Sequence, residues 1–137
     1  MSAVRRPTPV PTSMTAPFWE AAKERRLVIR RCLKCGHYHH PPNGQCPHCL
    51  SLDLSWQQVS GHGRVYEFTV MYEARVSGFE QAVPYACILV ELDEEPGVFV
   101  VANLIDTPIS AIRVGLPVRV DFEELPDGTV LPQFRTA

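Results

Sequence analysis

Residues 32–49 read CLKCGHYHHPPNGQCPHC, which places two CxxC pairs ten residues apart. A CxxC turn lets two thiolates converge on one ion while nearby backbone N–H groups donate hydrogen bonds to the sulfur atoms. Gly36 follows the first pair directly and supplies the permissive backbone that such a turn needs. The spacing therefore predicts one metal ion held by four thiolates. The predicted ligands are Cys32, Cys35, Cys46 and Cys49.

This metal site is expected to be structural rather than catalytic. Four protein ligands fill a tetrahedral shell, so no water is left to be activated. The segment holds few large apolar residues, and metal binding of roughly 10–16 kcal/mol is what would fold it. We expect one zinc ion per chain, with iron as the competitor because an all-sulfur tetrahedron suits both metals. Four histidines nearby offer replacement ligands, but four sulfurs suffice and we expect these side chains to face solvent: His37, His39, His40 and His48.

The chain after the cysteines has the pattern of β-structure. Alternating apolar residues predict a half-buried strand over residues 52–56. Gly61 and Gly63 then interrupt the chain, and five further strands follow with short turns between them. A helical turn is expected at 106–113, before the last two of these strands. The five predicted strands are residues 65–72, 86–92, 98–104, 118–122 and 130–134. Five strands in so short a segment predict a small closed barrel of the OB type.

The chain before the cysteines divides into a tail and a helix. Residues 1–14 are rich in proline and are expected to form a flexible or partner-wrapped tail. Phe18 and Trp19 lie on the apolar side of a short predicted helix, which a strand connects to the first cysteine. The predicted organisation is thus a tail (1–14), a helix with a metal ribbon (15–58) and a barrel (59–137), in a mainly β protein.

Charge and composition restrict the possible functions. Residues 1–50 hold eight Lys or Arg against two acids, whereas residues 51–137 hold five Arg against thirteen acids. A barrel half with so many acids does not suit a general nucleic-acid binder. No apolar run is long enough for a membrane span and no apolar segment follows the first charges, so we expect a cytoplasmic protein. In that reducing compartment the fifth cysteine, Cys87, is expected to be a buried core thiol.

An ordered set of motifs resembles a known family of acyl-CoA-associated proteins. These small proteins combine an N-terminal helix, a rubredoxin-like zinc ribbon and a C-terminal OB-fold. The resemblance covers about residues 16–137. The motifs that carry it are Phe18-Trp19-Glu20, the two CxxC pairs with Pro41-Pro42 between them, Gly61-His62-Gly63-Arg64-Val65-Tyr66-Glu67-Phe68-Thr69, Pro84-Tyr85, Val90-Glu91-Leu92, Gly115-Leu116-Pro117-Val118 and Leu131-Pro132-Gln133-Phe134-Arg135.

The resemblance implies an accessory subunit, since members of that family typically accompany thiolase-superfamily enzymes that act on acyl-CoA. It implies a hetero-oligomer with a thiolase or retro-aldolase subunit, and steroid side-chain breakdown is the favoured setting in lipid metabolism. The subunit would stabilise its partner and help to form the acyl-CoA entrance, with acyl-CoA contacted indirectly.

No residue of this chain is assigned a catalytic role, because the sequence lacks a Gly-rich phosphate loop, a paired-carboxylate motif and HExxH. Aromatic and Arg side chains near the ribbon, and in and beside the 73–84 loop, are candidates for contacting the partner or acyl-CoA, as anchors or phosphate clamps. These candidates are Trp19, Phe79, Tyr85, Arg30 and Arg31. The alternatives are free-standing modules that bind CoA or, through barrel aromatics, single-stranded nucleic acid. We expect the aromatics to be core residues and expect no nucleic-acid partner.

Overall fold

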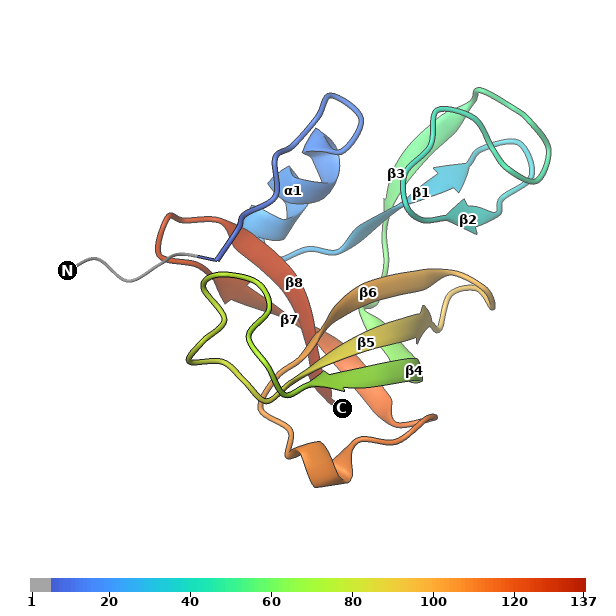
Figure 1. The fold of residues 1–137 in the computed structure, drawn as a ribbon. Helices are drawn as coiled ribbons and strands as arrows, with labels where there is room; N and C mark the ends of the chain where they lie inside the picture. The colour runs from blue at the N-terminus through green and yellow to red at the C-terminus, as the bar shows by residue number, and fades with distance from the viewer. Residues whose placement is uncertain (1–5) are drawn as a thin grey trace.

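A computed structural model describes residues 6–137 as a helix, a three-stranded sheet and a closed barrel (Figure 1). In chain order the elements are α1 (Ala16–Lys23), β1 (Val28–Cys32), β2 (Tyr38–His39), β3 (Leu54–Gln58), β4 (His62–Met71), β5 (Tyr85–Leu92), β6 (Phe99–Leu104), the 3₁₀ helix η1 (Ile109–Ala111), β7 (Pro117–Glu124) and β8 (Val130–Thr136). The first five residues of the predicted tail lie outside the described residues. Neither helix in residues 6–137 has the length and apolar character of a membrane span.

The barrel confirms the predicted mainly β fold with five OB-type strands. Its neighbours run in the order β4-β5-β6-β8-β7, and β4 closes the ring by pairing with β7. Gly63 lies at this closure, opposite Leu92 on β5 and Val118 on β7. A Cβ at Gly63 would collide with the carbonyl oxygen of Glu91, so the close approach of the strands requires glycine there.

The core fills the barrel because side chains on a strand alternate between its two faces. In β5 every second residue is buried, beginning with Ala86 and Ile88. Phe134 of β8 is the largest fully buried side chain and lies opposite Val120 on β7. The core therefore draws on strands that are distant in sequence.

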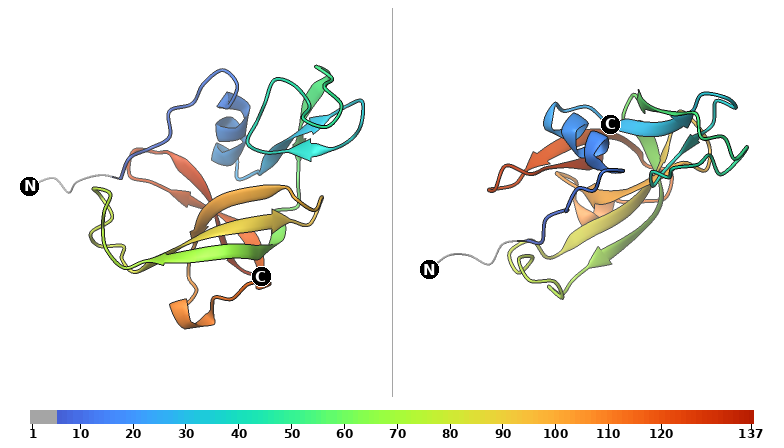
Figure 2. Two further views of the ribbon diagram at one scale, coloured as in Figure 1. Left: turned by 45° about the vertical axis from the view of Figure 1, so that its right-hand side comes forward. Right: turned by 90° about the horizontal axis from the view of Figure 1, so that it is seen from above.

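The helix and the ribbon lie together over one side of the barrel, while the β4–β5 loop projects from the end opposite to the ribbon (Figures 1 and 2). Phe18, on the predicted apolar side of the helix, is only 8% exposed and belongs to the core. Its ring stacks on His40 of the ribbon, with 5.5 Å between ring centroids. Phe18 therefore joins the helix to the ribbon, and little of its ring is left for contact with a partner.

Strand β4 corrects the expectation that the barrel aromatics are core residues. Its pairing with β5 shifts register between Val65 and Glu67, so Tyr66 lies in a β-bulge. The register of β4 with β7 covers only residues 62–64, and the later part of β4 pairs with β5 alone. As a result Tyr66 is 50% exposed and Phe68 37% exposed, and Tyr72 just beyond the strand is 69% exposed.

Candidate metal centre and its surroundings

The ribbon presents its cysteines from two turns of similar design. Strands β2, β1 and β3 form its antiparallel sheet, and Cys32 ends β1. The residue after each CxxC pair has a left-handed backbone and donates its N–H to the carbonyl of the first cysteine. In the first turn this residue is Gly36 (φ 80°), as predicted. In the second turn it is Leu50 (φ 66°), and a leucine gives no sign in the sequence of a left-handed backbone.

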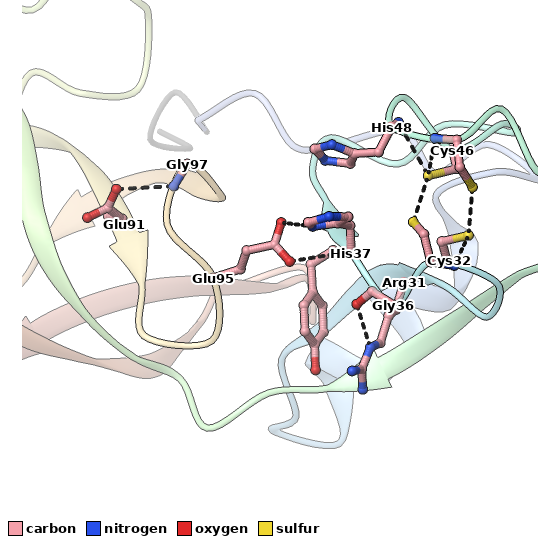
Figure 3. Close-up of polar contacts among 12 residues, drawn as sticks. Arg31, Cys32, Gly36, His37, Cys46, His48, Glu91, Glu95 and Gly97 are labelled. Carbon is pink, nitrogen blue, oxygen red and sulfur yellow. Dashed lines mark hydrogen bonds and ion pairs between the residues drawn. The ribbon is translucent and has the colours of Figure 1, made fainter.

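The four cysteine sulfurs face one another (Figure 3). The sulfur atoms lie within 4.8 Å of each other, and two pairs, Cys32–Cys49 and Cys35–Cys46, are 3.6 Å apart. Zn–S bonds of about 2.3 Å in a tetrahedron give an S–S separation of about 3.8 Å. The donor set and its spacing therefore fit one zinc ion, and no histidine joins this cluster in the described part of the chain.

Backbone amides prepare the sulfurs for a cation. The Cys35 amide donates to the Cys32 sulfur at 3.4 Å and lowers the pKa of that thiol to about 6. For Cys35 a backbone hydrogen bond from His37 acts to lower the pKa, but desolvation and the neighbouring sulfurs raise it to about 12. The cluster thus keeps some protons by itself, and a metal ion must displace them to obtain four thiolates.

Two of the histidines expected to face solvent are instead packed within the fold. His39 is 7% exposed, and its Nε2 lies 3.4 Å from the carbonyl oxygen of Asn43. His40 is half-buried against Phe18, and this burial lowers its pKa to about 4. His40 is therefore a neutral ring at neutral pH and acts as a packing group between ribbon and helix.

Trp19 and Cys87 both line a cavity of about 420 Å³ between the helix, the ribbon and the outer face of the barrel. Trp19 is half-buried and meets Phe18 edge to face at 5.0 Å. Cys87 was expected in the core, but it points outward, because its neighbours Ala86 and Ile88 occupy the inner face. Burial under the helix raises the pKa of the Cys87 thiol, so this cysteine stays protonated.

Phe79 and Tyr85 form an aromatic pair at the end of the barrel that carries the β4–β5 loop. Their ring centroids are 5.0 Å apart, and the Arg6 guanidinium lies over the Phe79 ring at 5.0 Å. Arg6 also forms an ion pair with Glu123 at 3.2 Å. All four residues line a second cavity of about 380 Å³, so part of the predicted tail packs on this loop.

Arg30 and Arg31 lie in the ribbon, apart from the aromatic pair at the opposite end (Figure 1). The Arg30 guanidinium lies over Trp56 at 5.1 Å, and that of Arg31 lies over Tyr38 at 4.8 Å. The Nε of Arg31 also donates to the carbonyl oxygen of Gly36 at 3.0 Å. The structure therefore distributes the five predicted contact residues over three places rather than one.

Comparisons with known proteins assign the two parts of the chain to described domains. Residues 19–55 match the family model of the ChsH2 rubredoxin-like zinc ribbon domain. Residues 56–123 match that of the ChsH2 C-terminal OB-fold domain. The first match resolves the choice between zinc and iron: the chain contains a zinc ribbon whose four cysteines are positioned to bind a zinc ion.

Similar proteins are named as an aldolase and as hydratase subunits for CoA compounds. A solved structure named "Ltp2-ChsH2(DUF35) aldolase" is 40% identical with a TM-score of 0.84, covering 94% of this chain and 98% of that one. A "probable enoyl-CoA hydratase alpha subunit" of Thermomonospora curvata is 41% identical over 96% of this chain. A "3-oxo-4,17-pregnadiene-20-carboxyl-CoA hydratase alpha subunit" of Mycobacterium tuberculosis is 34% identical over 82% of it.

The chain spans less than half the length of the two hydratase-subunit relatives. The chain spans 40% of the Thermomonospora protein and 35% of the Mycobacterium protein. By contrast, it covers 85% of a "DUF35 domain-containing scaffold protein" of Pyrococcus furiosus, which is 34% identical over 83% of this chain.

Proposed function

This chain belongs to the ChsH2 (DUF35) family of zinc-ribbon and OB-fold proteins, and on that premise we propose that it is a non-catalytic accessory subunit. It binds and stabilises a thiolase-like enzyme that acts on acyl-CoA, as a thiolase or a retro-aldolase. In the resulting hetero-oligomer it helps to shape the entrance for acyl-CoA.

The observation that carries this proposal is the similarity to the structure named as an Ltp2-ChsH2(DUF35) aldolase, which extends over 98% of that chain. A match over nearly the whole chain supports transfer of the role more strongly than one shared domain does. The Pyrococcus relative named as a scaffold protein supports the same role. The Mycobacterium relative, whose name contains a pregnadiene-carboxyl-CoA, supports a steroid side chain as the acyl group.

The chain's own surface favours its loop end as the partner contact. Phe79 and Tyr85 form a tilted aromatic pair there, with Arg6 above Phe79, and all three side chains line a cavity. Aromatic and Arg side chains around a depression are the groups that dominate protein interfaces. Arg30 and Arg31, which are both partly exposed on β1 of the ribbon, are the proposed contacts for phosphates of CoA.

A complex with a thiolase-fold aldolase subunit tests this proposal. We expect the purified chain alone to turn over no acyl-CoA and to form a stable complex when the two proteins are coexpressed. Phe79→Ala should weaken the complex by about 1–4 kcal/mol, since truncating an interface anchor costs that much. Isothermal titration calorimetry measures the loss. Leu52→Ala, which changes a 77% exposed side chain in the ribbon, is the control and should leave affinity unchanged.

Trp19→Ala separates partner binding from internal packing. Because Trp19 is half-buried against Phe18, the variant should lose stability as a free chain. If Trp19 is also an interface anchor, the affinity of the folded variant for the partner enzyme falls as well. Turnover of an acyl-CoA by the isolated chain, with contaminating enzyme excluded, would show that the accessory role is wrong.

Nucleic-acid binding is the second candidate, because the exposed rings on and beside β4 resemble the stacking platform of OB-folds. The acidic barrel half opposes it, since its thirteen acids outnumber its five Arg and the net negative charge repels phosphates. We expect single-stranded oligonucleotides to bind no tighter than about 10⁻⁴ M at physiological salt. Fluorescence anisotropy over a salt series measures this. A micromolar complex that weakens with salt and with Tyr66→Ala would instead favour the nucleic-acid function.

A further inference from the structure

A second group of metal-ligand side chains lies where the ribbon meets the barrel. It consists of His37, His48 and Glu95, whose ligand atoms all lie within 4.8 Å of one another (Figure 3). His37 follows the first cysteine pair and His48 lies within the second, whereas Glu95 belongs to the turn between β5 and β6. The group therefore joins two parts of the fold that are far apart in sequence.

Glu95 is held in place before any ion arrives. One carboxylate oxygen accepts the backbone N–H of Tyr38 at 3.2 Å. The other lies 3.2 Å from Nδ1 of His37. Its side chain is only 19% exposed, so the carboxylate has a fixed direction toward the ribbon.

The two imidazole rings lie next to each other on the accessible side. The rings of His37 and His48 are stacked with centroids 4.2 Å apart and planes 25° apart. Both side chains are exposed, so an ion from solvent reaches their nitrogens. An ion pair between His37 and Glu95 accounts for two of these groups, whereas a metal ion uses all three.

The spacing suits a tetrahedral cation. Zn–N and Zn–O bonds of about 2.0–2.2 Å place neighbouring ligand atoms about 3.3–3.5 Å apart. The 3.2 Å between His37 Nδ1 and the Glu95 oxygen is close to that value. Two imidazoles and one carboxylate are a familiar ligand set for zinc and leave the fourth position to water.

We propose that His37, His48 and Glu95 form a second zinc site, separate from the four cysteines, that ties the ribbon to the barrel when it is filled. Both histidines belong to the segment that carries the cysteine ligands, so the bound ion fixes that segment against the β5–β6 turn. Because this site is open to solvent and has three protein ligands, it exchanges its metal more readily than the closed four-sulfur site. The inference does not depend on the partner enzyme.

Cobalt titration of the chain loaded with one equivalent of zinc, which fills only the tighter four-cysteine site, tests the proposal. With the four cysteines already occupied, added Co²⁺ reports only on the second site. We expect one further equivalent, with weak visible bands and without the intense near-ultraviolet charge transfer of thiolate ligation. Glu95→Gln and His48→Asn should each weaken this binding at least about tenfold, because even loss of an outer-shell partner costs about 10–100-fold in metal affinity.

Matched controls exist in the same turn and on the same surface. Glu94→Gln changes the adjacent carboxylate, which is bound instead to Ser60, and should leave cobalt affinity unchanged. His62→Asn removes an exposed histidine of β4 and should do the same. Unaltered zinc content and circular dichroism of all variants show that the ribbon remains folded. The proposal is overturned if no second equivalent binds at millimolar cobalt, if thiolate bands appear, or if Glu94→Gln reduces affinity as much as Glu95→Gln.

Discussion

Cys46→Ser is expected to abolish tight zinc binding and to unfold the ribbon. Cys46 is fully buried, and its sulfur accepts the amides of both His48 and Cys49 at 3.4 Å. Loss of this thiolate leaves three ligands and disrupts the turn that positions them. Because metal binding of roughly 10–16 kcal/mol is folding free energy in such ribbons, no other interaction of the segment replaces it.

Zinc per chain, measured by elemental analysis after extensive dialysis, should fall from one equivalent to nearly none. Limited proteolysis should then cut between β1 and β3, where the wild-type chain resists. Cys87→Ser is the matched control, because this thiol lies in the cavity under the helix rather than in the cluster, and it should keep its zinc. If Cys46→Ser retains a full equivalent of tightly held zinc, the four-cysteine assignment is wrong.

Phe134→Ala is expected to cost about 3–5 kcal/mol of unfolding free energy, the range for removing a buried aromatic side chain. Phe134 is fully buried at the centre of β8. It lies opposite Leu104 of β6 in the parallel pairing and opposite Val120 of β7 in the antiparallel one. Truncation therefore leaves a cavity where three strands meet, and neighbours on a closed barrel have little freedom to collapse into it.

Urea denaturation followed by fluorescence measures this loss as a lower midpoint. Tyr72→Ala is the control, because a side chain that is 69% exposed contributes within about 0.5 kcal/mol. Equal midpoints for Phe134→Ala and the wild type would contradict the assignment of Phe134 to the barrel core.

Local patterns in the sequence predict most of the fold. The run of apolar residues at 86–92 predicts the strand that the structure shows as β5, and the Asp-Glu-Glu-Pro-Gly run at 93–97 marks the turn after that strand. The CxxC spacing predicts that four sulfurs converge, and the structure places them together. The two-residue strand β2 is too short to leave such a pattern and escapes prediction.

The wrong predictions share one cause: each concerns a side chain whose exposure is set by an element distant in the sequence. Cys87 lies among apolar residues in the sequence, yet it lines a cavity on the outer face of the barrel. Tyr66 follows the apolar pattern of a strand, but a register shift against β5 exposes it. Residue type and spacing carry no information on these contacts.

The amino-acid sequence by itself therefore determined the metal ligand set and the order of the strands along the chain, because these depend on residue spacing and patterning over a few residues. The number of strands in so short a segment then indicated a closed barrel. Only the tertiary structure decided what lies at the junction between ribbon and barrel. Glu95 meets His37 and His48 there although it is separated from them by 58 and 47 positions in the chain. The physical reason is that such contacts form only when the folded ribbon packs against the folded barrel. The packing of their two surfaces involves many residues that are distant in the sequence.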